Sequence, residues 1–301
     1  MVTYEIQSAI ESIEKNSALY DEINFDSRVN AIDDLEFNII DRIEGLLATT
    51  HQPEDLVVLK RNAERVQRQL EAINDHLFQR LRADIRAGLC AGPLLKSVLD
   101  KYAGGDTNGS SDSPEIGYDS LDVLINGLLL SPAVITETKA REPEMIPYQQ
   151  TPARMMLELV EKAPLTEQAV FYDIGSGLGQ VPTLVHLLTG ATAKGIEFEP
   201  AYCDYARACA ADLNLSAIEF INADARTVDY SDGTVFFMYT PFVGSLLQTV
   251  LEKLQRETHS KVVWVCTYGP CTPTVAQQSW LEGVDQSEAG LYQLGVFKRA
   301  G

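Results

Sequence analysis

From residue 169 onward, short apolar runs alternate with longer amphipathic segments, and no other feature of the sequence constrains the fold as strongly. We expect strands at 170–173, 193–197, 218–222, 234–239, 261–267 and 291–298. We expect helices in the gaps, at 179–188, 200–213 and 244–256. Strands that alternate with helices form a mostly parallel sheet covered by helices on both faces. The sequence therefore predicts an α/β fold for this half of the chain.

The first hundred residues predict helices and almost no strand. Asp26 or Ser27 can cap a helix that is apolar at steps of three and four as far as Leu47. Pro53 suits the first turn of a second helix, whose apolar stripe is Leu56, Leu59, Ala63, Val66, Leu70, Ile73, Leu77, Leu81 and Ile85. Such a stripe must pack against another helix. An intrachain bundle is the simpler interpretation, and a homodimer joined through these helices is the alternative.

Composition divides the chain into three segments. Residues 1–103 are predicted to form an α-helical bundle domain, and 118–301 the α/β domain. Between them, 104–117 is rich in Gly, Ser and Asp, which is typical of a flexible linker or surface loop. Two further helices are expected in the second domain, at 120–130 and at 152–162 with Pro152 in its first turn.

Charge and cysteine content exclude several classes of protein. The net charge of −19 argues against binding of nucleic acid or of a nucleosome. The densest basic stretch, 60–86, is interleaved with acidic residues and is interpreted as a solvated helix face. Five cysteines without a CxxC pair, and four scattered histidines, argue against disulfides and metal sites and favour a cytoplasmic location. No uncharged apolar stretch reaches the roughly 18 residues of a membrane span, and the start of the chain shows no secretion signal.

The most informative segment is a glycine-rich loop between the first strand and the first helix of the α/β half. It has the spacing Asp173-x-Gly175-x-Gly177-x-Gly179, followed by Gln180. Glycines permit a sharp turn and close approach of a ligand to the backbone, and the helix that follows offers free N–H groups. Loops that bind dinucleotides place their third glycine one residue later, where this chain has Gln180. A carboxylate at Asp173 suits a ligand with an ammonium group, such as the methionine end of S-adenosylmethionine.

Two more acidic residues follow the next two strands. Glu197 ends the second strand, where a carboxylate can accept hydrogen bonds from both ribose hydroxyls. Asp224 ends the third strand and could accept a hydrogen bond from an adenine amino group. Each residue alone is equally well explained as a solvent-exposed turn. Three acidic residues at successive strand ends, together with the loop, predict a nucleoside site.

The run from Asp173 to Gly179, with Glu197 and Asp224, resembles the motifs of class I S-adenosylmethionine-dependent methyltransferases over residues 148–268. Within that superfamily, DIGSGLGQV is most similar to the non-SET histone-lysine methyltransferases, the disruptor-of-telomeric-silencing family. The resemblance implies a Rossmann-like, mostly parallel seven-stranded sheet. It also implies S-adenosylmethionine as cofactor, S-adenosylhomocysteine as product, and no metal.

The resemblance extends to individual residues. A Tyr-x-x-Thr element of that family folds over the cofactor, and Tyr148-Gln149-Gln150-Thr151 is similar to it. The alternative interpretation of Tyr148 and Thr151 is a surface turn and a helix cap for Pro152. The residues implied at the cofactor are Tyr148, Thr151, Asp173, Gly175, Ser176, Gly177, Gly179, Gln180, Glu197, Phe198, Asp224, Ala225 and Tyr239. The residues expected around the transferring methyl group are Tyr148, Thr240, Pro241 and Phe242, with Tyr268 and Pro270 at the same edge of the sheet.

The chain also departs from that family. Thr240 stands where the family has an asparagine, and it retains a hydroxyl and a carbonyl but no amide. The segment Tyr239-Thr240-Pro241-Phe242 differs from the (Asn/Asp)-Pro-Pro-(Tyr/Phe) of enzymes that methylate planar amines. No histidine lies beside these motifs, and His186 is expected to pack in the core, so no general base is assigned. A histone substrate is not supported, because this chain lacks basic segments.

These observations favour a methyltransferase that acts by in-line displacement on an unidentified acceptor, protein or small molecule, with a protein lysine or other amine among the candidates. The alternative is a catalytically silent S-adenosylmethionine-binding protein with a regulatory or scaffolding role. An NAD-dependent oxidoreductase is disfavoured by the glycine spacing.

Overall fold

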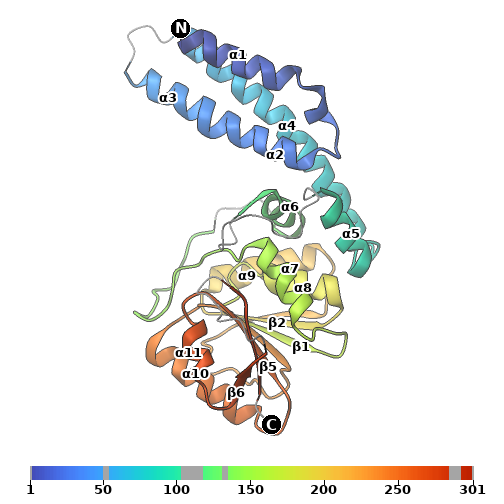
Figure 1. The fold of residues 1–301 in the computed structure, drawn as a ribbon, viewed down its shortest axis with the longest axis vertical. Coiled ribbons are helices and arrows are strands. Elements are labelled where there is room, and N and C mark those ends of the chain that lie inside the picture. The colour runs from blue at the N-terminus through green and yellow to red at the C-terminus, as the bar shows by residue number, and fades with distance from the viewer. Residues whose placement is uncertain (1, 50–53, 103–117, 131–134, 285–292, 300–301) are drawn as a thin grey trace. The chain divides into compact units, whose positions relative to one another are not determined.

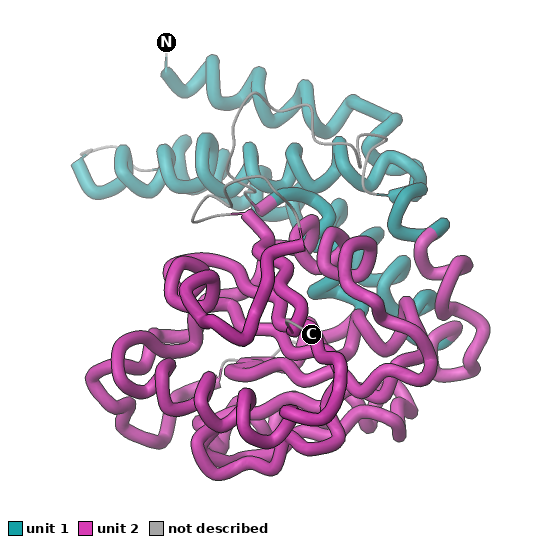
Figure 2. Tube along the Cα trace, turned by 60° about the horizontal axis from the view of Figure 1, so that its bottom comes forward, with its two compact units in different colours: residues 1–83, 97–109, 119–128 teal, residues 84–96, 110–118, 129–301 magenta. Residues whose placement is uncertain are grey.

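The computed structural model describes residues 2–49, 54–102, 118–130, 135–284 and 293–299 (Figure 1). The chain forms two compact units, which Figure 2 distinguishes by colour. Unit 1 comprises 1–83, 97–109 and 119–128, and unit 2 comprises 84–96, 110–118 and 129–301. The predicted linker at 104–117 and Pro53 lie outside the described residues, and the predicted domain boundaries stay predictions.

The N-terminal half is helical, as expected. Its elements are α1 (Val2–Lys15), η1 (Ser17–Tyr20), α2 (Phe25–Asp33), η2 (Asp34–Ile40), α3 (Asp41–Leu47), α4 (Glu54–Arg86), α5 (Gly92–Tyr102) and α6 (Ser120–Leu129). One continuous helical stretch, π-helical in its middle, runs from α2 to α3. Its N-cap is Asn24, so the predicted caps Asp26 and Ser27 are wrong by two and three positions and lie within the helix.

The apolar stripe of α4 is buried within the chain over most of its length. From Leu56 to Leu70 it packs in one hydrophobic cluster with residues of α1, η1, η2 and α3. Ile73 is only half-buried, and its neighbour Asn74 is the residue that points into the interior. Asn74 Oδ1 accepts a hydrogen bond from Arg28 Nε at 2.7 Å. A straight helix drifts against a seven-residue repeat, so the stripe changes its inward-facing residues here before it continues at Leu77.

The basic stretch at 60–86 is only partly a solvated face. Lys60 and Arg65 form ion pairs with glutamates of α3 and α1, and Arg80 pairs with Glu22 in the turn between η1 and α2. Arg82 contradicts the prediction, since it is buried and donates a hydrogen bond to the Leu128 carbonyl at 2.9 Å. A long stem and five donors allow arginine to satisfy backbone carbonyls in the interior, which charge patterning alone does not reveal.

The second unit contains α7 (Ala153–Lys162), β1 (Val170–Ile174), α8 (Gln180–Thr189), β2 (Thr192–Glu197), α9 (Pro200–Asp212), β3 (Ile218–Asn222), β4 (Val235–Tyr239), α10 (Gly244–Glu257), β5 (Trp264–Tyr268), α11 (Thr272–Ala276), β6 (Leu281–Gly283) and β7 (Gly295–Arg299). The first four predicted strands agree to within a residue at each end. The fifth begins three residues later than predicted and the last begins four later, while 291–292 lie outside the described residues. Pro152 is the N-cap of α7 and precedes its first turn.

The strands form one sheet in the order β3-β2-β1-β4-β5-β7-β6. The first five are parallel, and β7 runs antiparallel to both β5 and β6. Helices α7, α8 and α9 cover one face, and α10 and α11 cover the other (Figure 1). This sheet confirms the predicted seven-stranded, Rossmann-like α/β class.

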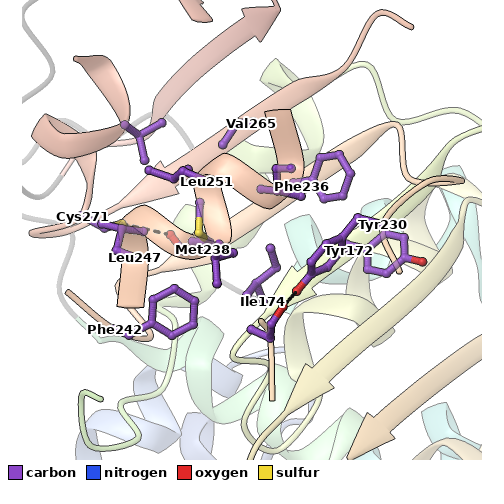
Figure 3. Close-up of a cluster of buried hydrophobic side chains, with 14 of the residues drawn as sticks. Tyr172, Ile174, Tyr230, Phe236, Met238, Phe242, Leu247, Leu251, Val265 and Cys271 are labelled. Atoms are coloured by element: carbon purple, nitrogen blue, oxygen red, sulfur yellow. Dashed lines mark hydrogen bonds between the residues drawn. The ribbon is translucent and has the colours of Figure 1, made fainter. Parts of the chain in front are cut away.

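Successive side chains of the central strands point to opposite faces of the sheet, and each face packs against its own layer of helices. Tyr172 and Ile174 of β1 point into the cluster beneath α10, whose members labelled in Figure 3 are Tyr172, Ile174, Tyr230, Phe236, Met238, Phe242, Leu247, Leu251, Val265 and Cys271. The intervening residue Asp173 therefore faces the α8 side. The strand order reverses between β1 and β4, and ligands of open α/β sheets bind outside the carboxyl ends of the strands at such a point.

None of the helices in the described ranges is long and apolar enough to cross a membrane.

Candidate active site

The loop at 175–179, hereafter the glycine loop, takes a backbone path that suits glycine. Gly175, Gly177 and Gly179 have φ angles of 86°, 52° and 83°. These lie in the left-handed region, which costs residues with a Cβ about 1 kcal/mol or more. The amides of Gly175 and Ser176 donate to the Ile196 carbonyl at 2.9 and 3.0 Å, which ties the loop to β2. Gly179 is the N-cap of α8, so the loop leads directly into a helix N-terminus, as predicted.

Asp173 is a buried carboxylate for which the described residues provide no hydrogen-bond or ion-pair partner. Only 3% of its surface is exposed, at the bottom of a cavity. Burial, followed by the nearby charge of Glu197, raises the pKa of Asp173 well above its usual value. The Ser176 hydroxyl is also buried without a partner and lines the same cavity. Unpaired buried polar groups are costly, so both side chains are suited to a polar ligand.

Glu197 ends β2 and is bound to the backbone on both sides. Its Oε2 accepts from the Gly177 amide and its Oε1 from the Glu199 amide, each at 2.7 Å. Burial raises the pKa of Glu197 although these donors oppose the shift. Each carboxylate oxygen can accept more than one hydrogen bond, so Glu197 can hold the glycine loop and still accept from a ligand.

Asp224, at the end of β3, is paired with Arg226. The guanidinium Nε lies 3.0 Å from both carboxylate oxygens, and the same arginine contacts Glu142. The hydrogen bonds from Arg226 lower the pKa of Asp224. The sequence did not reveal this pairing.

One cavity of about 240 Å³ brings most of the predicted residues together at the carboxyl edge of the sheet. Among its lining residues are Tyr148, Thr151, Asp173, Gly175, Ser176, Gln180, Glu197, Phe198, Asp224, Ala225, Tyr239, Thr240, Pro241, Phe242 and Pro270. Gly177 and Gly179 lie behind this surface and shape the loop. Tyr268 is buried behind it as well, with its ring 5.0 Å from that of Tyr239.

The cavity is also lined by a segment that sequence reasoning treated as irregular. Residues 137–148, hereafter the strap, run across the carboxyl ends of the strands. Glu199, the N-cap of α9, accepts from the Thr138 hydroxyl at 2.6 Å and from the Lys139 amide at 2.8 Å. At the other end, Glu144 Oε2 accepts from the Leu246 amide at 2.7 Å, at the start of α10. Proline-punctuated chain gives no periodic signal, so the sequence did not predict an ordered segment here.

The ring of Phe198 contacts the ammonium group of Lys139. The Lys139 ammonium of the strap lies 3.4 Å from the ring centroid, in a cation–π arrangement. Lys139 and Arg141 line the cavity together with Glu137. The strap therefore brings both signs of charge to a site that its strand ends alone would make acidic.

Tyr148 closes the cavity over the glycine loop. Its hydroxyl donates to Gln180 Oε1 at 2.9 Å, and its ring lies 5.3 Å from that of Tyr202. Burial raises the pKa of Tyr148 above its ordinary range, so the phenol stays protonated and serves as a donor. The predicted contact of Tyr148 with the cofactor stays a prediction.

Thr240 lines the cavity, and its hydroxyl bonds to two backbone groups. It donates to the Tyr268 carbonyl at 2.9 Å and accepts from the Cys271 amide at 3.1 Å. Thr240 also has a left-handed φ of 39°, which is uncommon for a β-branched residue. The side chain therefore joins the turn after β4 to the turn after β5, and the hydroxyl is committed to that role.

Neither a metal ligand set nor a histidine base is found at the site. Across the described ranges, no group of three His, Cys, Asp or Glu side chains is arranged to hold a metal ion. No histidine of the described part lines the cavity, and His186 Nδ1 lies 2.8 Å from the Ala191 carbonyl.

Comparison with known proteins gives one family. Residues 143–243 match the family model described as Histone methylation protein DOT1. The comparison with curated proteins gives no match.

Several solved structures have a similar fold. An RNA methyltransferase from Salinibacter ruber in complex with S-adenosyl-L-homocysteine is 24% identical, with 50% of this chain and 92% of that chain covered and a TM-score of 0.41. A putative methyltransferase from Escherichia coli is 20% identical, with 53% and 90% covered and a TM-score of 0.42. A SAM-dependent methyltransferase from Aquifex aeolicus is 18% identical, with 49% and 93% covered and a TM-score of 0.41.

The strand order with its antiparallel β7 gives unit 2 the fold typical of class I S-adenosylmethionine-dependent methyltransferases, and the family match covers many of the residues that line the cavity. The segment from the strap to the turn after β4 is similar to Histone methylation protein DOT1.

Proposed function

We propose that the chain is an active methyltransferase that binds S-adenosylmethionine in the cavity and transfers its methyl group to an amine, such as a protein lysine. The observation that carries the proposal is the unpartnered, buried carboxylate of Asp173, beside Glu197 and above the glycine loop. A buried carboxylate without a counter-charge is unfavourable unless a ligand supplies one.

The residues present fit this cofactor. Asp173 would face its ammonium group, the partnerless Ser176 hydroxyl can donate to its carboxylate, and Glu197 can accept from the ribose hydroxyls. When bound, S-adenosylmethionine supplies a methyl group activated by a sulfonium. Tyr148 of the strap, with its ring over the glycine loop, would keep water from the methionine end.

The acceptor side favours a neutral nucleophile. The turn after β4 contributes Pro241 and Phe242, and the strap contributes Met145 and Ile146. An apolar environment lowers the pKa of an amine, because burial disfavours its charged form. An amine acceptor would therefore release its proton to water as it enters the cavity and meet the donor uncharged, which is consistent with a cavity that no histidine of the described residues lines. The charge of −19 disfavours nucleosomes and other nucleic-acid complexes as acceptors.

A second candidate function is a silent binding protein. The observation that favours it is the commitment of the Thr240 hydroxyl to Tyr268 and Cys271, at the position nearest the expected acceptor. Such a protein would bind the cofactor without turnover.

Calorimetric titration separates these functions. The wild-type chain, Asp173→Ala and Asp173→Asn are titrated with S-adenosylhomocysteine, with NAD in parallel. Asp204→Asn serves as the matched control, because Asp204 pairs with Arg207 on α9 and does not line the cavity. We expect wild type and control to bind S-adenosylhomocysteine with a Kd of micromolar order, worth about 8 kcal/mol, and not NAD. We expect both Asp173 variants to lose at least about tenfold in affinity, equivalent to about 1.4 kcal/mol.

Turnover is then measured with S-adenosylmethionine labelled in its methyl group, against fractions of a lysate and a lysine-rich peptide. Label in an acceptor supports the enzyme, and cofactor binding without label in any fraction favours the silent protein. Failure to bind S-adenosylhomocysteine, or tight binding of NAD, would contradict both candidate functions, the enzyme and the silent binding protein.

A further inference from the structure

Lys139 of the strap is held at its backbone and extends its side chain into the cavity. Its amide donates to Glu199 Oε2 at 2.8 Å, at the N-cap of α9. Its ammonium lies 3.4 Å from the centroid of the Phe198 ring, and both side chains line the cavity. Among the residues that the structure describes, no carboxylate pairs with this ammonium, so the Phe198 ring is its main partner.

The Phe198 ring and the end of β3 form two sides of one subsite. Asn222 Nδ2 donates to the carbonyls of Glu197 and Phe198 at 2.9 and 3.1 Å, which holds the ends of β2 and β3 together. Phe198 and Asp224 line the cavity next to Glu197, the proposed partner of the ribose. A base attached to that ribose would therefore lie against the Phe198 ring, within reach of Asp224. The space between Phe198 and Asp224 is called the base subsite.

The ammonium of Lys139 lies at the base subsite. Hydrogen bonds from Arg226 lower the pKa of Asp224, and the positive charge of Lys139 adds to this shift, so the ammonium is close to Asp224 as well as to the ring. At 3.4 Å from the centroid, the nitrogen is in van der Waals contact with the ring face. A base that stacks on the same face needs that contact for its own atoms, and two groups cannot fill one space.

We propose that Lys139 competes with the base of the cofactor for the Phe198 ring, so that binding has to displace the ammonium. This inference rests on the proposed function, because the competing ligand is S-adenosylmethionine or its product. The cation–π contact exists only in the free protein, so its free energy opposes binding. The strap thus carries a side chain that weakens cofactor affinity, and the size of the effect is that of an exposed cation–π contact, about twofold to fivefold in Kd.

The test compares Lys139→Ala with wild type. Both are titrated with S-adenosylhomocysteine, and surface plasmon resonance gives the rates of association and dissociation. We expect Lys139→Ala to bind about twofold to fivefold more tightly, through faster association with unchanged dissociation. Weaker binding or faster dissociation would show that Lys139 contacts the bound ligand. Unchanged affinity would show that the base does not need this ring face, and either result overturns the proposal.

Two further variants tie the effect to the ring. Lys139→Arg keeps a cation that stacks well on aromatic faces, and it should bind no more tightly than wild type. In Phe198→Leu the ammonium has no ring to contact, so adding Lys139→Ala should leave the affinity nearly unchanged. A full gain in that background would indicate a general effect of charge at the cavity and would contradict the proposal. If Phe198→Leu binds too weakly to measure, Lys139→Ala and Lys139→Arg still decide.

Lys162→Ala is the matched control. It removes the same charge from an ion pair with Glu158 on α7 that does not line the cavity, and it should bind S-adenosylhomocysteine as wild type does. Failure of wild type to bind this ligand would defeat the proposed function. The competition by Lys139 fails instead when wild type binds and Lys139→Ala binds no more tightly, so the two failures are distinguishable.

Discussion

The ring of Tyr148 lies directly on Gly177. A Cβ built on Gly177 would stand 2.3 Å from Cε2 of that ring, which is far inside van der Waals contact. The glycine therefore meets two requirements at once, a left-handed φ of 52° and room for an aromatic ring from the strap.

We expect Gly177→Ala to destabilise the protein by about 1–2 kcal/mol through its left-handed φ, and more if the Tyr148 ring cannot move aside. Displacement of Tyr148 should also weaken binding of S-adenosylhomocysteine. Thermal denaturation and calorimetry provide the two measurements. Gly45→Ala is the control, because Gly45 lies within α3 with nothing within 4 Å of its added Cβ, and this change should be neutral or stabilise by up to about 1 kcal/mol. Full stability and affinity in Gly177→Ala would contradict the close packing.

Ligand binding should depend on pH through Asp173. Its pKa is raised by burial in the free protein, and an ammonium ligand beside it would lower that pKa. Binding then releases a proton, so affinity for S-adenosylhomocysteine should rise as pH increases through the raised pKa and then level off. Calorimetry in buffers of different ionisation enthalpy measures the released proton. Asp173→Asn should abolish this pH dependence, and a pH-independent wild type would refute it.

The same substitution should stabilise the free protein. Asp173→Asn removes a carboxylate that is ionised only at a cost in this buried position, and we expect a gain of about 1–3 kcal/mol near neutral pH. Chemical denaturation without ligand tests this gain. A less stable Asp173→Asn would mean that the carboxylate has a favourable partner after all.

Glu199 should contribute to stability near neutral pH and lose that contribution in acid. Burial opposes its ionisation, but donors from Thr138, Ala201 and Lys139 outweigh burial and lower the pKa of Glu199 to about 2. A lowered folded-state pKa stabilises the protein above the unfolded value of 4.5, and that stability is lost as pH falls towards about 2. Glu199→Gln should therefore cost about 1–2 kcal/mol at pH 7 and almost nothing near pH 2. A pH-independent difference between the two proteins would argue against this account.

Thr240 should matter for structure through its hydroxyl. Thr240→Val keeps the branched shape and removes the bridge to Tyr268 and Cys271, which we expect to cost about 1–3 kcal/mol. Thr240→Ser should recover most of that loss. Denaturant titrations of both variants measure the difference. If Thr240→Val is as stable as wild type but inactive, the hydroxyl has a catalytic role that the structure does not assign to it.

Arg28 should stabilise unit 1 through its buried hydrogen bonds. It is fully buried, and its guanidinium donates to Asn74 Oδ1 and to the carbonyls of Leu19 and Asp21. Arg28→Met leaves those acceptors unpaired, and we expect a loss of about 2–4 kcal/mol. Both tryptophans, Trp264 and Trp280, lie in unit 2, so the loss should shift the circular dichroism transition more than the fluorescence transition. Arg61→Met, on the exposed face of α4, is the control.

Features that repeat locally along the chain could be predicted from the sequence. The spacing of Asp173, Gly175, Gly177 and Gly179 placed the loop correctly, and the strand-end position of Glu197 placed the second carboxylate at the cavity. Both follow from short-range rules, because parallel strands bring their carboxyl ends to one edge. Strand β6 and helix α11, with three and five residues, are too short to give a period.

The features that escaped prediction depend on pairs of residues distant in sequence. Arg28 with Asn74, and Glu142 with Arg226, are 46 and 84 positions apart, and neither partner looks unusual in its local context. The direction of the Thr240 hydroxyl depends on a turn after a different strand. Hydrogen-bond geometry of this kind is decided after the elements have packed, and single-sequence patterns do not encode it.

The two walls of the cavity differ in how they tolerate mutation. Asp173 and Glu197 are placed by the backbone register of β1 and β2, which most side-chain substitutions leave intact. The strap is held by a few side-chain contacts at Glu142, Glu144 and Glu199, each of which a single codon change can remove or relocate. Successive substitutions can therefore reshape the strap while the strand-end carboxylates keep their positions. In evolutionary terms, the strap is the wall of the cavity that single substitutions can reshape most readily.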